Sequence, residues 1–410
     1  VYTSRSDFVG DFDDVRQFTD MVEDLEGGDF YRMEILPAKT TNDGALYGYP
    51  GFTLFSSTSR EDTARLFRRL AYHGNNINSY KYVASTAVGN SLFGIKYLLL
   101  KNGATRDTEL RTVAQQEGMT LLENPHAIEL GLAADSSFFG WTPSYSSPFL
   151  VWNDMLKDMA NLPPVFVPIK PEVVSGGNFQ PSTGDANSGL RFAPENRSAS
   201  TLMNLEVYVE KDQYVYFAVD ASQTTSVKVK VNRMGGYNSV DSDPFVDPDV
   251  ADPASTSSDL TLGTETVKLD EQRSIHWIET FDAGYCRAGD VVELIFEQEK
   301  DKSSDVTVYA ATMDKADYES AMAALKTREL DVTSWEADRI TASYTAPEAG
   351  LLYLTIPYDE SWSAEIDGVK VETESIANKA LLAVPTEAGE HSIELVFRPK
   401  GFTIGLSLTI

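Results

Sequence analysis

Alternation of apolar and polar residues runs through most of the chain after residue 161 and restricts that part to antiparallel strands. The period is visible in LEVYVEKDQYVYFAVD, SVKVKVN, VVELIFEQ, VTVYAAT, ITASYTA and HSIELVFRP. A two-residue period places one face of a strand against a core and the other face in solvent. The sequence therefore predicts β-sandwich units, interrupted by one helix in MDKADYESAMAALKTREL.

An internal sequence repeat divides these strands into two units. AGDVVELIF at 288–296 resembles AGEHSIELVF at 388–397, with one residue inserted, and each stretch carries a tight Ala-Gly-acid turn into a strand. We expect one sandwich over 161–312, a helical connector over 313–330 and a second sandwich over 331–403. The two sandwiches could share a sheet.

Residues 1–160 mix helix and strand patterns. DFDDVRQFTDMVEDLE has apolar residues at helical spacing and ends at Gly27 and Gly28. STSREDTARLFRRLAYHG predicts a helix capped by Ser59 and ended by Gly74. FYRMEIL and LFGIKYLLL read as buried strands. The predicted fold is thus an α+β N-terminal domain followed by mainly antiparallel, jelly-roll-like β-sandwich units.

Composition excludes several classes of partner. Asp and Glu total 62 against 34 Lys and Arg, a formal charge of −28, which repels nucleic acid and opposes docking onto anionic lipid. The single cysteine, Cys286, rules out a disulfide within the chain and is expected to be buried. The four histidines lack metal-ligand spacing, so no metal and no cofactor are expected.

Carboxylate clusters offer three readings, none of which the residues establish as catalytic. DFDD at 11–14 contains a D-x-D, which in some sugar-nucleotide transferases holds a divalent metal, but here it opens a helix, where acids suit the positive helix end. The loop at 241–259 could wrap calcium, although it lacks the glycine and bidentate glutamate of an EF-hand. Glu365 and Asp367 could belong to a glycosidase pair, but IDGVK predicts a hairpin turn with Asp-Gly at its apex.

Three aromatic loops are the candidate contact sites. LYGYPGF, HGNNINSYKY and FFGWTPSYSSPF combine rings, amides and glycine, a mixture that can stack on a sugar and bond its hydroxyls. The same mixture occurs in well-packed irregular loops, which is the alternative. The residues predicted to bind substrate are Tyr47, Tyr49, Asn76, Asn78, Tyr80 and Trp141.

Several blocks, in order, resemble the YfhO family of bacterial polytopic membrane proteins. They are FYRMEI, NDGALYGYPGFTLFSST, NSLFGIKYLL, ENPHAIELGL, LLYLTIPYDESWSAEIDGVKV and AGEHSIELVFRPKGFTIGLSLTI. One departure is Ser361-Trp362, where the family often has Gly-Trp. The acidic loop at 241–259 does not align with the family pattern.

The resemblance implies a GT-C-type glycosyltransferase with a large extracytoplasmic domain before its last transmembrane helix. It implies a role in glycosylating envelope polymers such as lipoteichoic acid, with a lipid-linked sugar as donor and the catalytic carboxylate in the membrane part. We therefore expect a non-catalytic lobe at the extracytoplasmic face of the bacterial cell membrane. It would cover the membrane active site and engage a cell-envelope glycopolymer or lipid-linked sugar.

Three other expectations concern the last residues of the sequence and two alternative functions. Residues 404–410, within FTIGLSLTI, would begin that last membrane helix, or else form a final buried strand. The chain could instead be a stand-alone carbohydrate-binding or adhesive surface module. A secreted glycoside hydrolase is the third possibility, and it requires two carboxylates lining a cleft.

Overall fold

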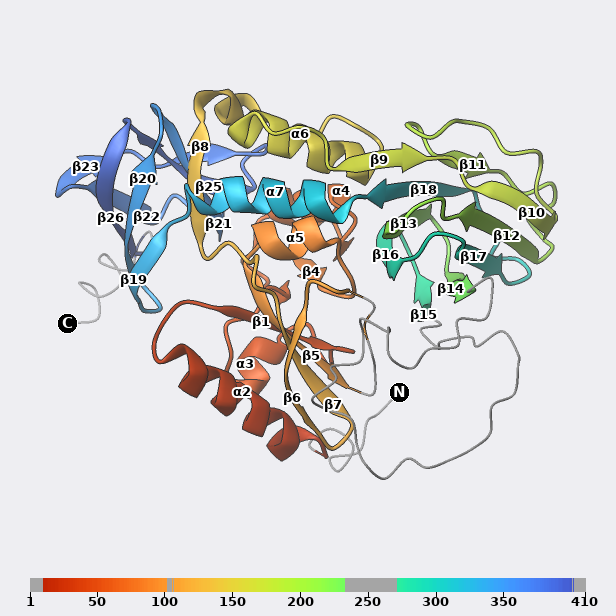
Figure 1. Cartoon of the computed structure of the whole chain (residues 1–410), viewed down its shortest axis with the longest axis horizontal. Helices are drawn as coiled ribbons and strands as arrows, with labels where there is room; N and C mark the ends of the chain where they lie inside the picture. Colours follow the sequence, from red (N-terminus) through yellow and green to blue (C-terminus); the bar gives the residue numbers. More distant parts are fainter. Residues whose placement is uncertain (1–9, 102–104, 106, 233–270, 400, 402–410) are drawn as a thin grey trace. The chain divides into compact units, whose positions relative to one another are not determined.

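The computed structural model describes residues 10–101, 105, 107–232, 271–399 and 401 (Figure 1). By their contacts they form two compact units. Unit 1 comprises Val1–Asn102, Arg111–Val165 and Ala316–Ile410, and unit 2 comprises Gly103–Leu110 and Phe166–Lys315. The loop expected at 241–259 and the segment expected at 404–410 lie outside the described residues.

The first sheet of unit 1 is mixed and packs against a helix. Its strand order is β1 (Arg32–Leu36), β5 (Ile95–Lys101), β7 (Met119–Glu123) and β6 (Arg111–Gln116), with β1 and β5 parallel. Helix α2 (Phe12–Glu26) lies beside this sheet in Figure 1 and packs Val15, Phe18 and Val22 against it. Gly27 ends α2 with a φ of 61°, which confirms the predicted stop.

The next segment is more irregular than predicted. It contains α3 (Asp43–Tyr47), α4 (Glu61–Arg69), α5 (Ala87–Leu92) and a small sheet of β2 (Leu54–Phe55), β4 (Ser79–Lys81) and β3 (His73–Gly74). The prediction for α4 is wrong at both ends. Arg60 occupies the N-cap position, whereas the Ser59 hydroxyl bonds to none of the described residues, and Gly74 belongs to β3.

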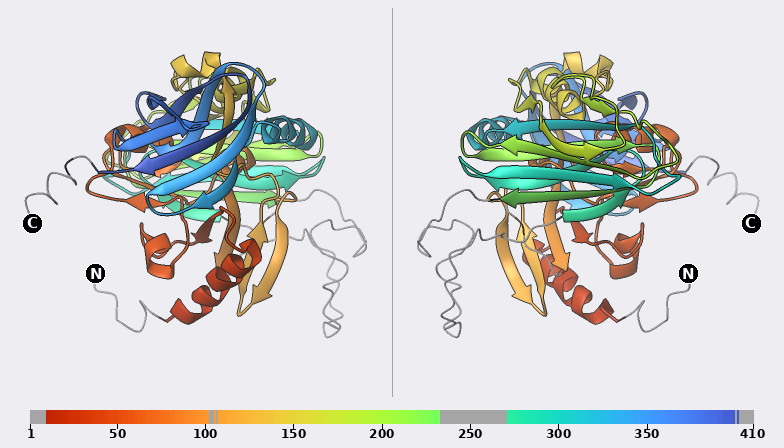
Figure 2. Two further views of the ribbon diagram at one scale, coloured as in Figure 1. Left: turned by 90° about the vertical axis from the view of Figure 1, so that its left-hand side faces the viewer. Right: turned by 90° about the vertical axis from the view of Figure 1, so that its right-hand side faces the viewer.

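The second half of unit 1 is a sandwich of two sheets. The β21 sheet has the order β24 (Glu374–Ile376), β25 (Leu381–Thr386), β21 (Gly350–Pro357), β8 (Gly131–Asp135). The β26 sheet has the order β19 (Asp331–Trp335), β20 (Arg339–Ala346), β26 (Gly389–Phe397), β22 (Trp362–Ile366), β23 (Val369–Val371), and faces the viewer in blue on the left of Figure 2. Leu352 and Val384 meet Ala342 and Leu395 in the core between them.

Strand β8 joins this sandwich although it lies more than 200 residues before β21 in the chain. Residues 331–403, expected as a unit of their own, are therefore grouped with the amino-terminal residues in unit 1. The 3-10 helix η1 (Ser136–Gly140) and α6 (Pro148–Ala160) follow β8. Helix α7 (Lys315–Lys326) falls within the segment expected as a helical connector. The predicted domain boundaries stay predictions.

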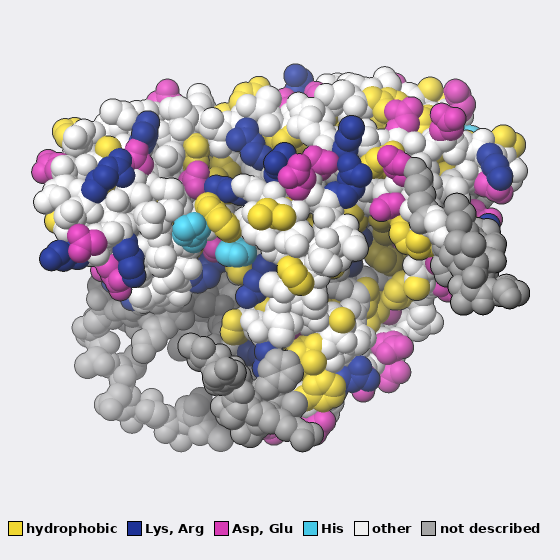
Figure 3. Space-filling view, turned by 180° about the vertical axis from the view of Figure 1, so that it is seen from behind, with side chains coloured by type: hydrophobic (Ala, Val, Ile, Leu, Met, Phe, Trp, Pro, Cys, Tyr) yellow, Lys and Arg dark blue, Asp and Glu magenta, His cyan; other side chains and the backbone are white. Residues whose placement is uncertain are grey.

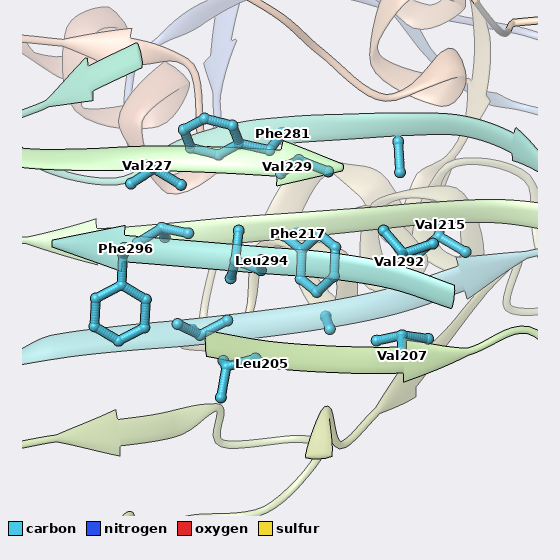
Figure 4. Packing of buried hydrophobic residues seen from close by; sticks show 14 of the residues in the cluster. Leu205, Val207, Val215, Phe217, Val227, Val229, Phe281, Val292, Leu294 and Phe296 are labelled. Atoms are coloured by element: carbon cyan, nitrogen blue, oxygen red, sulfur yellow. The ribbon is translucent and has the colours of Figure 1, made fainter. Parts of the chain in front are cut away.

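Unit 2 is a sandwich of two antiparallel sheets. The β13 sheet has the order β11 (Leu190–Phe192), β18 (Val306–Met313), β13 (Gln213–Ala221), β16 (Glu279–Cys286), with β9 (Phe166–Ile169) also on β18. The β17 sheet has the order β10 (Glu172–Gly177), β12 (Thr201–Tyr208), β17 (Val291–Gln298), β14 (Thr225–Asn232), β15 (Glu271–Ile275). Their alternate residues interdigitate in the core shown in Figure 4, including Phe217, Leu294 and Phe296.

The predicted fold class is confirmed, since an α+β region precedes mainly antiparallel sandwiches. Cys286 is fully buried at the end of β16, as expected from the sequence. Within the described ranges, no helix combines the length and apolar composition that a membrane span requires.

Candidate functional site

Tyr47 and Tyr49 lie in the core between α2 and the first sheet. Both rings are buried with Met33, Ile35 and Leu99. The chain can bury the hydroxyl of Tyr47 because that group donates a hydrogen bond to Asp11 Oδ1 at 3.2 Å. These two rings therefore pack the base of the loop that carries them.

Tyr80 on β4 belongs to an aromatic cluster, in which it contacts Phe52 and Phe67, and these two rings also contact each other. Its ring centroid lies 4.3 Å from that of Phe67 on α4 and 5.3 Å from that of Phe52. Phe93 and Tyr72 complete the contacts around Phe52. Edge and tilted ring pairs at such distances stabilise a core beyond their buried area. The structure thus brings two predicted loops together, through their interior faces.

Asn76 and Asn78 lie at the tip of the hairpin between β3 and β4, where both are half-buried. The tip is ordered by Asn75, whose Oδ1 accepts hydrogen bonds from the backbone N–H groups of Ile77, Asn78 and Ser79 at 2.9–3.0 Å. Asn76 takes a φ of 60°, which asparagine tolerates. Of the six predicted contact residues, these two keep appreciable solvent exposure.

Trp141 packs at the end of η1, in a different environment from the other five. Its ring lies 5.3 Å from Phe138, and its Nε1 donates to Asp154 Oδ2 on α6 at 3.1 Å. The residue is only 2% exposed. Tyr47, Tyr49, Tyr80 and Trp141 therefore offer no open ring face in this conformation, and the predicted sugar contact stays a prediction.

A buried carboxylate holds the first aromatic loop in place. Glu34 Oε1 accepts the backbone N–H groups of Phe52 and Thr53, each at 2.6 Å, and Oε2 accepts the Thr53 hydroxyl at 2.9 Å. Burial raises the pKa of Glu34 to about 7, against these hydrogen bonds, which lower it. These three hydrogen bonds hold Phe52, at the end of the loop, and the adjacent Thr53, so we assign Glu34 a positioning role.

The hairpin at Glu365 has the geometry that the sequence predicts. Ile366 pairs with Val369, and the two residues between them, Asp367 and Gly368, have φ angles of 51° and 76°. Positive φ at both positions matches the turn favoured by Asp-Gly. The Asp367 carboxylate also accepts from Ser392 N and contacts His391 Nδ1 at 2.7 Å. The predicted turn is confirmed, and it fixes the register of Glu365.

Each sandwich contains a pair of glutamates directly opposite each other on neighbouring strands. Glu365 on β22 faces Glu394 on β26. Glu206 on β12 faces Glu293 on β17, and on its other side it faces Glu172 on β10. In each pair one carboxylate has a cation: Arg339 bonds Glu394, and Lys230 lies 3.9 Å from Glu293. Like charges so placed repel each other, which makes these pairs unusual positions on the solvent faces.

The internal repeat in the sequence contains one glutamate of each pair. Glu293 in VELIF and Glu394 in IELVF occupy equivalent places in the two repeated stretches. In both strands these glutamates occupy the polar positions of an alternating pattern, which indicates that their carboxylates face solvent. Their glutamate partners come from strands distant in sequence, so only the register revealed the pairs. Elsewhere on the surface, Figure 3 shows acidic and basic side chains interspersed.

Comparisons with solved structures give only remote likenesses. Allantoicase is 8% identical, with 59% of this chain and 94% of that chain covered and a TM-score of 0.21. A Paenibacillus cycloisomaltooligosaccharide glucanotransferase is 6% identical, with 56% and 45% covered and a TM-score of 0.18. The mycobacterial arabinofuranosyltransferase AftD is 10% identical, with 73% and 26% covered and a TM-score of 0.17. At these TM-scores the likenesses carry no argument about this chain.

Comparison of the sequence itself is more informative. No curated protein matches the chain. The model of one protein family, described as bacterial membrane protein YfhO, matches residues 1–409. That match covers nearly every residue and agrees with the resemblance drawn from the sequence blocks. The chain therefore belongs to the YfhO family of bacterial membrane proteins.

Proposed function

We propose that this chain is the extracytoplasmic lobe of a membrane protein that takes part in glycosylating cell-envelope polymers, of which lipoteichoic acid is one type. The lobe would cover the membrane-embedded active site and engage the acceptor polymer or a lipid-linked sugar, without being catalytic alone. The single observation that carries the proposal is the match of the YfhO family model to residues 1–409. The two sandwiches, with polar outward faces, support a role in contact with hydroxyl-rich polymers.

A complementation experiment tests this proposal. Cells that lack the full-length protein should lose glycosyl substitution on an envelope polymer, and the full-length wild-type gene should restore it. The purified 410-residue chain should show no transfer of sugar by itself. Unchanged polymer glycosylation in the cells without the protein would overturn the proposal.

The predicted contact loops can be tested in the same cells. Because Tyr49 and Trp141 are buried, their alanine variants would confuse contact with folding. Asn76→Gly combined with Asn78→Ala keeps the left-handed backbone at residue 76 and removes two half-buried amides. It also removes the 3.0 Å hydrogen bond that Asn75 Nδ2 donates to Asn78 Oδ1, but keeps the bonds from the backbone N–H groups to Asn75 Oδ1. Asn187→Ala, at an exposed turn of unit 2, is the matched control. If the double variant glycosylates as well as the control, the hairpin is not a contact site.

One observation favours the hydrolase as a second candidate. Glu365 and Glu394 line the same hollow of the β26 sheet, and a glycosidase uses two carboxylates that lie near each other. That alternative requires the isolated chain to cleave a glycoside, and a carbohydrate-binding module requires affinity without cleavage. Incubating the chain with envelope polymers, and analysing released sugars, separates the two. Release that disappears in Glu365→Gln would favour the hydrolase.

A further inference from the structure

A hollow of about 320 Å³ lies on the solvent face of the β26 sheet, at the small end of the usual range for small-molecule sites. Threonine and serine side chains of β19 and β20 line it on one side, and Glu365 on β22 lines it on the other, with Ser392 and Glu394 of β26 between them. The lining side chains that matter here are Thr333, Thr341, Ser343, Ser392, Glu365 and Glu394. All of them belong to unit 1 and to adjacent strands or the hairpin beside them.

Glu365 is the incompletely satisfied group of this hollow. It lies opposite Glu394 on one side and opposite Lys370 on the other. Arg339 bonds Glu394, whereas the Glu365 carboxylate makes no hydrogen bond or ion pair with the residues that the structure describes. A half-buried carboxylate beside a like charge gains from any ligand that donates hydrogen bonds to it.

The opposite side of the hollow supplies hydroxyls that both donate and accept. Thr341 lies across from Glu394, and its Oγ1 is 3.0 Å from that of Thr333. Ser343 lies across from Ser392, whose hydroxyl donates to Asp367 Oδ1 at 3.1 Å. A ligand that fits this side must itself offer hydrogen-bond donors or acceptors. A sugar ring presents adjacent hydroxyls that can donate to one carboxylate and accept from the threonine side.

The sandwich of unit 2 provides an internal comparison. Glu206 lies opposite Glu293, which has Lys230 nearby, and also opposite Glu172 on β10. Glu365, by contrast, has Lys370 on its second side. The residues flanking Glu206 on the same face are Asn204 and Tyr208, which are larger than the serine and threonine residues around Glu365. Glu206 is therefore a control glutamate on the solvent face of a sheet, outside the hollow and opposite a like charge on each side.

We propose that the hollow on the β26 sheet binds one sugar residue of a glycan, with Glu365 accepting hydrogen bonds from two adjacent hydroxyls of that sugar. Arg339 compensates the charge of Glu394, which leaves the Glu365 carboxylate to accept hydrogen bonds from the ligand. The inference rests on the proposed function for the glycan as the biological ligand. The contact itself follows from the β26-sheet geometry.

Binding to the 410-residue chain tests the site directly. Threonine methyl groups are labelled, and the chain is titrated with a glucose tetrasaccharide, an N-acetylglucosamine tetrasaccharide and calcium chloride in separate NMR experiments. We expect one of the sugars to shift the resonances of Thr333 and Thr341. Glu365→Ala should weaken that binding about 10-fold or more, since it removes hydrogen bonds to a charged group. Glu206→Ala should leave it unchanged.

Glu365→Gln provides a second variant that keeps the shape and one acceptor, and it should bind between wild type and Glu365→Ala. The proposal is overturned if neither sugar moves these resonances, if calcium alone moves them, or if Glu206→Ala weakens binding as much as Glu365→Ala. The same Glu365→Ala substitution in the full-length protein separates the two proposals. Lost binding with intact polymer glycosylation would retain the site and refute its part in the proposed function.

Discussion

Glu365 and Glu394 lie directly opposite each other on β22 and β26, and Arg339 on β20 bonds the second of them. The pair stands on the solvent face of a sheet whose other face carries Ile393 and Leu395 into the core. The fold therefore fixes two like charges at neighbouring positions. Their cost to stability and their use for binding are separate questions, and the first can be measured without a ligand.

Removing the cation should expose the repulsion between these carboxylates. Arg339→Ala is expected to lower the free energy of unfolding by about 0.5–1 kcal/mol, because an exposed ion pair is lost beside a like-charge pair. Urea unfolding followed by tryptophan fluorescence measures this change, and added salt should shrink it. Arg339→Ala combined with Glu365→Gln should recover stability. A loss that is insensitive to salt and to the second substitution would refute the electrostatic account.

Glu34 should make stability depend on pH. Because its pKa is raised from 4.5 to about 7 in the folded chain, the folded state holds a proton that the unfolded state has released. Stability from this group is therefore complete at low pH and is lost as pH rises from about 4.5 to about 7.

Glu34→Gln cannot ionise and should escape that loss. The difference in unfolding free energy, variant minus wild type, should rise by roughly 1–3 kcal/mol between about pH 4 and pH 8. Denaturant unfolding across this range measures it. Glu297→Gln, an exposed position on β17, controls for the change in net charge. If the unfolding free energies of wild type and Glu34→Gln depend on pH in the same way, the assigned cost of burying the ionised Glu34 carboxylate is wrong.

Gly131 should be essential where β8 meets β21. A Cβ at this position would lie 2.0 Å from the carbonyl oxygen of Tyr353, a backbone atom that cannot move without parting the strands. Gly131→Ala is expected to cost about 1–3 kcal/mol or more through overpacking. Gly140→Ala, whose Cβ would meet nothing within 4 Å, is the control and should be nearly neutral. Thermal unfolding of both variants measures the difference. Equal midpoints for Gly131→Ala and Gly140→Ala would contradict the close approach of Gly131 to the Tyr353 carbonyl oxygen.

Trp141 should behave as a core residue. Trp141→Ala is expected to lose about 3–5 kcal/mol of stability, because the ring is buried against Phe138. Trp141→Phe should lose less, since packing is partly kept while the hydrogen bond to Asp154 is removed. Tyr145→Ala, in the same loop and 45% exposed, should change stability by about 0.5 kcal/mol or less. If the Trp141→Ala variant is as stable as wild type, the ring does not act as a core residue.

The sequence by itself determined which segments become strands, because an alternating pattern fixes which side chains meet a core and which meet water. It determined the Asp-Gly hairpin at residues 367–368, the stop of α2 at Gly27 and the burial of Cys286. It also determined the family, because that match depends on residue order alone.

Only the tertiary structure decided which distant strands are neighbours. The pairing of β8 with β21, and of Glu365 with Glu394, depends on contacts between residues far apart in the chain, which local patterns do not encode. The same reason explains the aromatic loops. Ring-rich loops have one composition whether their rings face solvent or a core, and here the packing of Tyr80 against Phe67 placed that ring inside.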